Sequence, residues 1–170
     1  TGVTAIAYET VTSDHEPLPL LSPMSEIAGQ LAFVVGSNYL LKHNMGVGKL
    51  LGYSTELDPA IVTVVGAGAA GKQVILKAVA NGAHVKIIDL SVQKLTELES
   101  EFGTSNIEYI KSSPAAILAA VKKTDLLIGA VYVVGKTAPK VFTVDMIKSM
   151  KPGSVFVDIS IDQGGCSETS

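Results

Sequence analysis

The chain carries glycines whose spacing suits the binding of a phosphate group. A run of β-branched residues is followed by Gly66, Gly68 and Gly71. Gly66 permits a tight turn, Gly68 lets the backbone approach a pyrophosphate, and Gly71 lets the next helix lie close to the strand. The free N–H groups and the positive dipole end of that helix would face the phosphates. We therefore predict that this turn, together with Ala69 and Ala70, binds a cofactor.

An acidic residue stands where the ribose of a dinucleotide would lie. A helix-compatible segment from Lys72 to Asn81 is ended by Gly82, and the strand-like segment His84–Asp89 finishes in a carboxylate. Asp89 lies eighteen residues after Gly71, close to the spacing of a carboxylate that holds a ribose 2′-hydroxyl. Such a carboxylate repels a 2′-phosphate, which favours NAD over NADP. The alternative is a nucleotide-free domain in which Asp89 only caps a helix.

A second polar cluster follows a strand-like segment near the end of the chain. Asp158 and Asp162 lie four residues apart, and Gln163–Gly165 forms a loop in which the backbone can approach a ligand. We select Asp162 for chemistry because it lies beyond the strand, where cofactor and substrate would meet. A carboxylate there could orient an amine or a water molecule. The alternative is an Asx turn that closes the strand.

Composition narrows the class of protein. The chain has 170 residues, 17% of them charged, with a formal net charge of −3, which gives no support to a nucleic-acid partner. The histidines, His15, His43 and His84, show no metal-ligand spacing, so no metal site is predicted. The single cysteine, Cys166, cannot form an internal disulfide, which fits a cytoplasmic protein. We interpret Cys166 as a passive small residue and not as a nucleophile.

The elements that would position these residues alternate between strands and helices. Beyond Asp89 we predict helices near 91–102, 114–122 and 144–150 and strands near 107–110, 125–131 and 154–158. This alternation implies right-handed crossovers and a parallel sheet covered on both faces. The expected fold class is α/β, a doubly wound parallel sheet of the Rossmann NAD-binding type. Because ligands bind at the carboxyl ends of such strands, one crevice would gather the glycine turn, Asp89 and Asp162.

Two elements precede this sheet. Val3–Glu9 is predicted as a buried strand, and a helix is predicted from Ser22 as N-cap, with Pro23 in its first turn, to about Lys42. The helix is apolar on most sides, so we expect it to be buried between layers or subunits of a homo-oligomer. A membrane span is not expected, because polar residues interrupt the helix and leave the apolar run too short.

The chain resembles the alanine dehydrogenase family. The resemblance is carried by Tyr8–Val11, Pro23–Gly29, Val64–Gly71, Ile87–Leu90, Met150–Val155 and, most specifically, Val157–Gly165. Members of that family oxidatively deaminate L-alanine to pyruvate and ammonia with NAD, through hydride transfer from Cα. Nicotinamide nucleotide transhydrogenases share the architecture, but the residues around Asp162 fit alanine dehydrogenase better.

The resemblance implies roles for individual residues. By position, Ser25 would lie near the cofactor phosphates, Asp89 would hold the ribose, and Asp162 would be the catalytic aspartate. The other residues that it places against the cofactor are Lys94 and Ser112 near the adenosine, Val131 beside the nicotinamide, and Ile159.

The resemblance covers only the middle of the family's sequence. It implies that residues 1–21 are a remnant strand and loop of a substrate domain and that residues 22–170 are the NAD-binding Rossmann domain. The family's substrate-binding arginine and lysine and its catalytic histidine would precede Thr1. We therefore expect an NAD-binding part of an alanine dehydrogenase, with little turnover of its own. The alternative is a stand-alone Rossmann module that binds or senses NAD without catalysis.

Overall fold

A parallel five-stranded sheet, with strand order β3-β2-β1-β4-β5, organises the computed structural model. The structure describes residues 2–14, 18–52, 54 and 56–170, so His15 lies outside the described residues. The strands are β1 (Ile61–Val65), β2 (His84–Asp89), β3 (Ile107–Lys111), β4 (Leu126–Gly129) and β5 (Val155–Asp158). The helices are α1 (Ser22–Tyr39), α2 (Ala69–Ala80), α3 (Val92–Phe102), α4 (Pro114–Val121) and α5 (Val144–Lys148). Short 3₁₀ turns are η1 (Tyr8–Thr10), η2 (Lys42–Asn44) and η3 (Ile159–Gln163).

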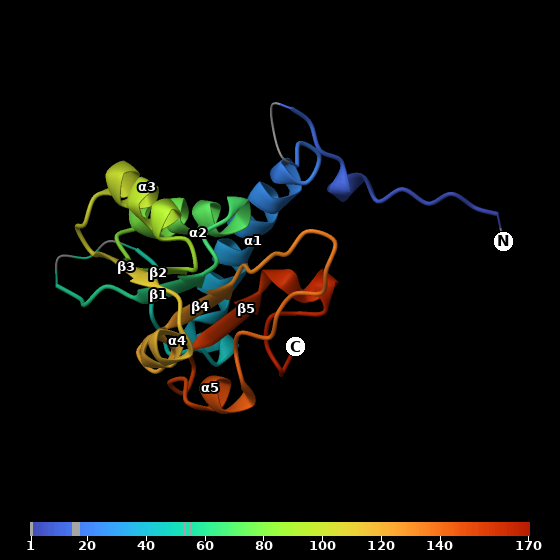
Figure 1. Ribbon diagram of the computed structural model, residues 1–170. Helices are drawn as coiled ribbons and strands as arrows, with labels where there is room; N and C mark the ends of the chain where they lie inside the picture. The colour runs from blue at the N-terminus through green and yellow to red at the C-terminus, as the bar shows by residue number, and fades with distance from the viewer. Residues whose placement is uncertain (1, 15–17, 53, 55) are drawn as a thin grey trace.

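The sheet is doubly wound, as the alternation of elements predicted. All strand pairs are parallel, and β1 lies between β2 and β4. Helices α1, α2 and α3 cover one face of the sheet, and α4 and α5 cover the other (Figure 1). The chain moves outward from β1 through β2 to β3 and then returns to the other side of β1 for β4. This reversal creates the crevice in which ligands bind to such sheets.

Alternate residues of each buried strand feed two hydrophobic layers. Val62, Val64 and Ile87 pack beneath α1, α2 and α3, while Val65 and Ile88 point to the opposite layer with α4 and α5. Because successive strand residues face opposite sides, continuous apolar strands require a cover on both faces. The near-continuous apolar strands of the sequence therefore required helices on both faces.

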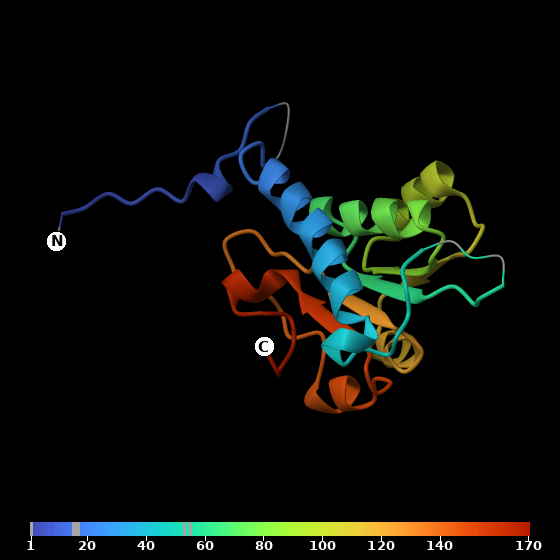
Figure 2. The ribbon, with the colours of Figure 1, turned by 180° about the vertical axis from the view of Figure 1, so that it is seen from behind.

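The predicted strand over Val3–Glu9 is wrong. Residues 2–7 form no strand, and Tyr8–Thr10 makes a 3₁₀ turn. Val3 and Ile6 are 79% and 80% exposed, and the segment projects away from the sheet in both views (Figures 1 and 2). An apolar, β-branched segment forms a stable strand only when its backbone finds a neighbouring strand to pair with. In the described part of the chain this segment has no such neighbour.

The predicted capping of α1 is also wrong. The helix begins at Ser22 itself, and its N-cap is Leu21, whose carbonyl accepts the Ser25 N–H. It ends at Tyr39 and not at Lys42. One face of the helix is buried, and it carries Gly29, Ala32, Phe33 and Gly36. The opposite face, with Ile27, Leu31 and Val34, is more than half exposed.

A buried carboxylate joins segments at the end of the sheet away from the crevice. Asp125, which has no exposed surface, precedes β4 and accepts the Ile61 N–H at 2.8 Å and the Lys49 Nζ at 3.1 Å. Lys151 Nζ, from the turn before β5, donates to its other oxygen. Burial acts to raise the pKa of Asp125, but the Ile61 N–H and the two lysines outweigh it, and the pKa lies below its ordinary value. Sequence analysis did not single out this carboxylate.

We predict that Asp125→Ala lowers the free energy of unfolding by about 1.5–3 kcal/mol near neutral pH, because it removes charge-assisted hydrogen bonds. Since the folded pKa is depressed, this contribution is present above the unfolded pKa of about 3.9 and is lost as the pH falls through the folded pKa. Urea unfolding of both proteins between about pH 7 and pH 3 measures the difference. Asp58→Ala, at an exposed position, serves as control and should cost less than about 0.5 kcal/mol. Equal losses for both variants would contradict the prediction.

Candidate functional site

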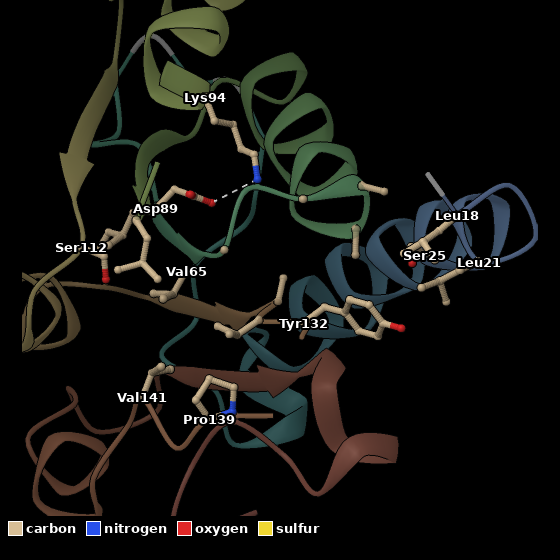
Figure 3. A pocket seen from close by; sticks show the side chains of 18 of the residues that line it. Leu18, Leu21, Ser25, Val65, Asp89, Lys94, Ser112, Tyr132, Pro139 and Val141 are labelled. Atoms are coloured by element: carbon tan, nitrogen blue, oxygen red, sulfur yellow. Dashed lines mark ion pairs between the residues drawn. The ribbon is translucent and has the colours of Figure 1, made fainter. Parts of the chain in front are cut away.

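A cleft of about 650 Å³ opens at the carboxyl ends of the central strands. Its floor is made by Val65, Gly66, Ile88 and Ala130, which lie at or just after the ends of β1, β2 and β4. In Figure 3 Leu18, Leu21 and Ser25 form one side of the cleft, and Asp89 and Ser112 form the other. The location is the one expected at the reversal of strand order.

The glycine turn is held by close backbone packing. Gly66 has a φ of +94°, and a Cβ there would overlap the carbonyl oxygen of Ala130. A Cβ at Gly71 would overlap the carbonyl oxygen of Gly66. At Gly68, by contrast, a Cβ would meet no atom within 4 Å. Gly66 and Gly71 therefore shape the turn, while the side of Gly68 faces open space in which a ligand can lie against the backbone.

Helix α2 directs its N-terminus into the cleft. It begins at Ala69, three residues earlier than the predicted Lys72, and its N-cap is Gly68, which supplies no side-chain hydrogen bond. Gly68, Ala69 and Ala70 all line the cleft. An uncapped first turn leaves N–H groups and the positive dipole end for an anion. The turn is thus suited to a pyrophosphate.

Asp89 lies at the end of β2 with an 11% exposed side chain. Its Oδ2 accepts the Ala67 N–H at 2.8 Å, and its Oδ1 accepts the Ser91 N–H at 2.8 Å. The Ser91 side chain, in turn, caps α3 by accepting the Lys94 N–H. Asp89 therefore orders both the glycine turn and the approach to α3. Each carboxylate oxygen keeps a second lone pair, so these contacts are compatible with a ribose hydroxyl in the cleft.

A lysine stands beside this carboxylate. Lys94 Nζ lies 3.8 Å from Asp89 Oδ2 (Figure 3). Its side chain is 42% exposed, so the pair contributes little to stability. Lys94 and Ser112 both line the cleft next to Asp89. These three residues, which are distant in sequence, form its polar end.

A second cavity, of about 140 Å³, continues from the other end of the cleft. The two hollows share six lining residues, which are Leu21, Ser25, Ala70, Ala130, Val131 and Tyr132. The smaller cavity adds Ile159, Ser160, Asp162 and Gln163 from the turn after β5, and Met24 and Ala28 from α1. The two sequence clusters are therefore brought to neighbouring cavities with a shared wall.

The turn after β5 is built around Asp158. Asp158 Oδ1 accepts the Ser160 N–H at 3.0 Å, and Oδ2 accepts the Cys166 N–H at 2.9 Å. The Cys166 Sγ also donates to Oδ1. Asp158 is thus occupied in closing the turn, while the exposed Asp162 lines the smaller cavity. The structure therefore gives the two acids different surroundings.

Two loops are joined at this end of the site. Ser160 Oγ donates to the Val131 carbonyl at 2.7 Å, and the Ala138 N–H donates to the Gln163 carbonyl at 3.0 Å. The loop after β4 therefore positions the turn after β5. The strand predicted over 125–131 ends at Gly129 because the backbone then leaves the sheet to form this loop.

The structure brings nearly all of the predicted cofactor residues together. Those lining the larger cleft are Ser25, Gly66, Gly68, Ala69, Ala70, Asp89, Lys94, Ser112 and Val131. Ile159 and Asp162 line the smaller cavity. Gly71 lines neither and packs beneath the turn, so its contribution is to the shape of the turn.

Sequence reasoning missed part of the lining. The missed residues are mainly apolar: Leu18, Leu21, Met24, Pro139 and Val141. Tyr132 is not among them, because the resemblance indicated Val131 and the segment after it beside the nicotinamide. The residues at the start of α1 carried no such signal, because only the crossing of α1 over α2 brings them to the cleft.

Among the described residues, no group of three or more histidine, cysteine, aspartate and glutamate side chains is arranged to hold a metal ion. No helix among them combines the length and apolar character needed to cross a membrane.

The parallel sheet, the glycine turn and the acid after β2 together define a Rossmann-like dinucleotide-binding domain. Residues 32–170 match the family described as "Alanine dehydrogenase/PNT, C-terminal domain", and the chain belongs to this family. It is 48% identical over 169 residues to the alanine dehydrogenase of Mycolicibacterium smegmatis, covering 99% of this chain and 45% of that protein.

Solved structures give the same picture. An L-alanine dehydrogenase superposes with a TM-score of 0.90 and 44% identity, over 96% of this chain and 45% of the other. A transhydrogenase from Sinorhizobium meliloti superposes with a TM-score of 0.76 and 27% identity, over 88% of this chain and 44% of the other. The chain thus spans a little under half the length of these relatives.

We predict that native Cys166 resists a thiol reagent near pH 8. Burial is the main cause that raises the pKa of its thiol to about 12, and the Asp158 carboxylate adds to the effect. The thiolate, which is the reactive form, is therefore scarce in the folded protein. Absorbance on adding a disulfide reagent should show no reaction in buffer and one reacting thiol per chain in urea. Rapid labelling of the folded protein would contradict the prediction and point to an accessible thiol.

Proposed function

We propose that this chain is the NAD-binding part of an L-alanine dehydrogenase, which oxidises L-alanine to pyruvate and ammonia. One observation carries the proposal: the glycine turn and Asp89 line a cleft that shares six lining residues with the smaller cavity at Asp162. The chain's membership of the family and its 48% identity to a named alanine dehydrogenase support the choice of reaction.

The residues present fit NAD. The open side of Gly68 and the uncapped start of α2 suit the pyrophosphate. Asp89 suits a ribose carrying a free 2′-hydroxyl, since its negative charge disfavours a 2′-phosphate. When bound, NAD supplies the acceptor for a hydride from the substrate Cα. The protein contributes position and electrostatics.

Asp162 is our candidate for chemistry on the substrate. It is exposed on η3 and faces the smaller cavity beside Tyr132 and Val131. An ionised carboxylate there accepts hydrogen bonds from an ammonium group or from an attacking water molecule. Asp162 would therefore orient the amine before hydride transfer and the water molecule that releases ammonia.

A second candidate function is NAD binding without catalysis. Among the described residues that line the two cavities, Lys94 is the single cation, and it stands at the adenosine end. The described lining of the smaller cavity thus holds no cation for a substrate carboxylate. This favours binding without turnover for the chain by itself, and it places the substrate cation elsewhere in a complete enzyme.

Two further proposals concern the context of the domain. Residues 1–21 would belong to a substrate domain, which is supported by an N-terminal segment that projects from the sheet and packs Tyr8 against Met24. Residues 22–170 would form the NAD-binding Rossmann domain and hold the cleft.

A homo-oligomer would bury the apolar face of α1 formed by Ile27, Leu31 and Val34.

We predict that Asp89→Ala weakens NADH binding by about 1.5–3 kcal/mol, because a charge-assisted hydrogen bond to the ribose is lost. The same change should narrow the preference for NADH over NADPH, because the repelling charge is gone. Calorimetric titration of both cofactors measures the two effects. Asp145→Ala, at an exposed position outside the cleft, is the control. Unchanged NADH affinity in a folded variant would show that Asp89 is only a cap.

We also predict that the purified chain binds NADH with a micromolar to millimolar Kd but turns over L-alanine negligibly. The lining described here suits a cofactor but offers no cation to orient the substrate carboxylate, and orientation supplies much of the rate. Calorimetry gives the Kd, and NADH absorbance with L-alanine and NAD gives the rate. Robust turnover by the chain would show that the described cavities hold a complete catalytic site.

A further inference from the structure

Met24 places a thioether at the edge of the smaller cavity. Of the four methionines in the chain, Met24 alone lines either cavity. It lies in the first turn of α1 and is 45% exposed. Its Sδ accepts a hydrogen bond from the hydroxyl of Tyr8 at 2.9 Å, and this contact lies at the surface of the molecule. The thioether therefore stands close both to solvent and to the cavity.

The other sulfur-containing side chains differ from Met24 in exposure or in place. Met45 is 90% exposed, but it lines neither cavity. Met146 and Met150 are partly buried in the layer between the sheet and helices α4 and α5. Cys166 has no exposed surface. Because access to sulfur limits its oxidation, an oxidant at a low dose would reach Met24 and Met45 first.

Hydrogen peroxide converts a methionine thioether to a sulfoxide. A lone pair of sulfur attacks one peroxide oxygen, the S–O bond forms as the O–O bond breaks, and the other oxygen leaves as water. Sulfur loses an electron pair, and the peroxide gains it. The product is a polar group in place of an apolar one, and methionine sulfoxide reductases reverse the change. The oxidised state is therefore a reversible modification.

A sulfoxide at Met24 would change the character of the cavity wall. The volume of the cavity is about 140 Å³. Much of its wall is hydrocarbon, contributed by Leu21, Ala28, Ala70, Ala130 and Ile159. The sulfoxide oxygen is hydrated while the cavity holds water, but a ligand that fills the cavity would displace that water. A polar group that loses water without gaining a new partner opposes binding.

We propose that Met24 is a site of reversible oxidation by peroxide, and that its sulfoxide weakens the binding of NADH. The inference rests on the proposed function, because it takes the nicotinamide half of the cofactor to occupy the smaller cavity. It goes beyond that function by making cofactor binding respond to peroxide. Met24 does not line the larger cleft that contains Asp89, so binding of the adenosine half would be unaffected.

The test uses Met45→Leu protein, in which Met24 is the fully exposed methionine that remains. The protein is treated with a limiting dose of hydrogen peroxide, which is then destroyed with catalase, and peptide mass spectrometry locates the added oxygen. Calorimetry should show that oxidation at Met24 raises the Kd for NADH about five- to thirtyfold, the range expected for one polar group left unpaired. The Kd for ADP, which carries no nicotinamide, should stay the same.

Matched variants isolate the effect of the Met24 sulfur. Met24→Leu removes the sulfur, so the treated and untreated forms of this variant should bind NADH equally. Met24→Gln introduces a polar side chain of similar length and should bind NADH more weakly than wild type without any peroxide. Binding of ADP verifies that each variant is folded. If Met24→Leu fails to fold, the treated Met45→Leu protein still decides the question.

The outcomes separate this inference from the proposed function. An unchanged Kd for NADH after oxidation at Met24 would overturn the inference and indicate that the sulfoxide oxygen points out of the cavity. Resistance of Met24 to peroxide, or an equal loss of NADH binding in treated Met24→Leu, would also overturn it. Recovery of the original Kd after treatment with methionine sulfoxide reductases would support reversibility, and a lasting loss would refute it. Absence of NADH binding by the untreated protein would instead overturn the proposed function.

Discussion

The site depends on how closely backbones approach one another around the glycine turn. Three glycines mark where other backbone segments contact the turn. A Cβ at Gly66 would overlap the loop after β4, and a Cβ at Gly71 would overlap the carbonyl of Gly66. A Cβ at Gly29 of α1 would overlap the carbonyl of Ala70. A side chain at any of these glycines would push apart elements that line the cleft. The absence of side chains lets β1, α2, α1 and the β4 loop converge, and their convergence places the N-terminus of α2 at the cleft.

Polar contacts then hold the irregular segments around this packed centre. Asp89 accepts N–H groups from the glycine turn and from the approach to α3. Asp158 does the same within the turn after β5, and Ser160 joins that turn to the loop after β4. In each case an acidic or hydroxyl side chain satisfies backbone groups that no strand or helix can pair. The loops of the site are therefore ordered by side chains that stand at strand ends.

The local pattern of apolar and β-branched residues correctly predicted the central strands of the sheet. β1 and β2 lie where apolar, β-branched runs predicted them, because such runs suit strands covered on both faces. It failed for Val3–Glu9, whose composition is equally strand-like but which has no neighbouring strand in the described structure. It also did not identify the buried face of α1, since an apolar helix does not specify which of its faces meets the sheet. A sequence pattern gives an element's preference, and packing decides whether that preference is met.

The sequence by itself determined the glycine turn and the acid after β2, and it made Asp162 a candidate, because each depends on residue type and spacing within one local unit. Only the tertiary structure decided that Asp158 closes a turn, that Asp125 holds two distant lysines, and that Gln163 keeps an unpaired acceptor. The physical reason is that hydrogen bonds and burial depend on partners remote in sequence. Such partners are known once the sheet order and the helix crossings have brought them together.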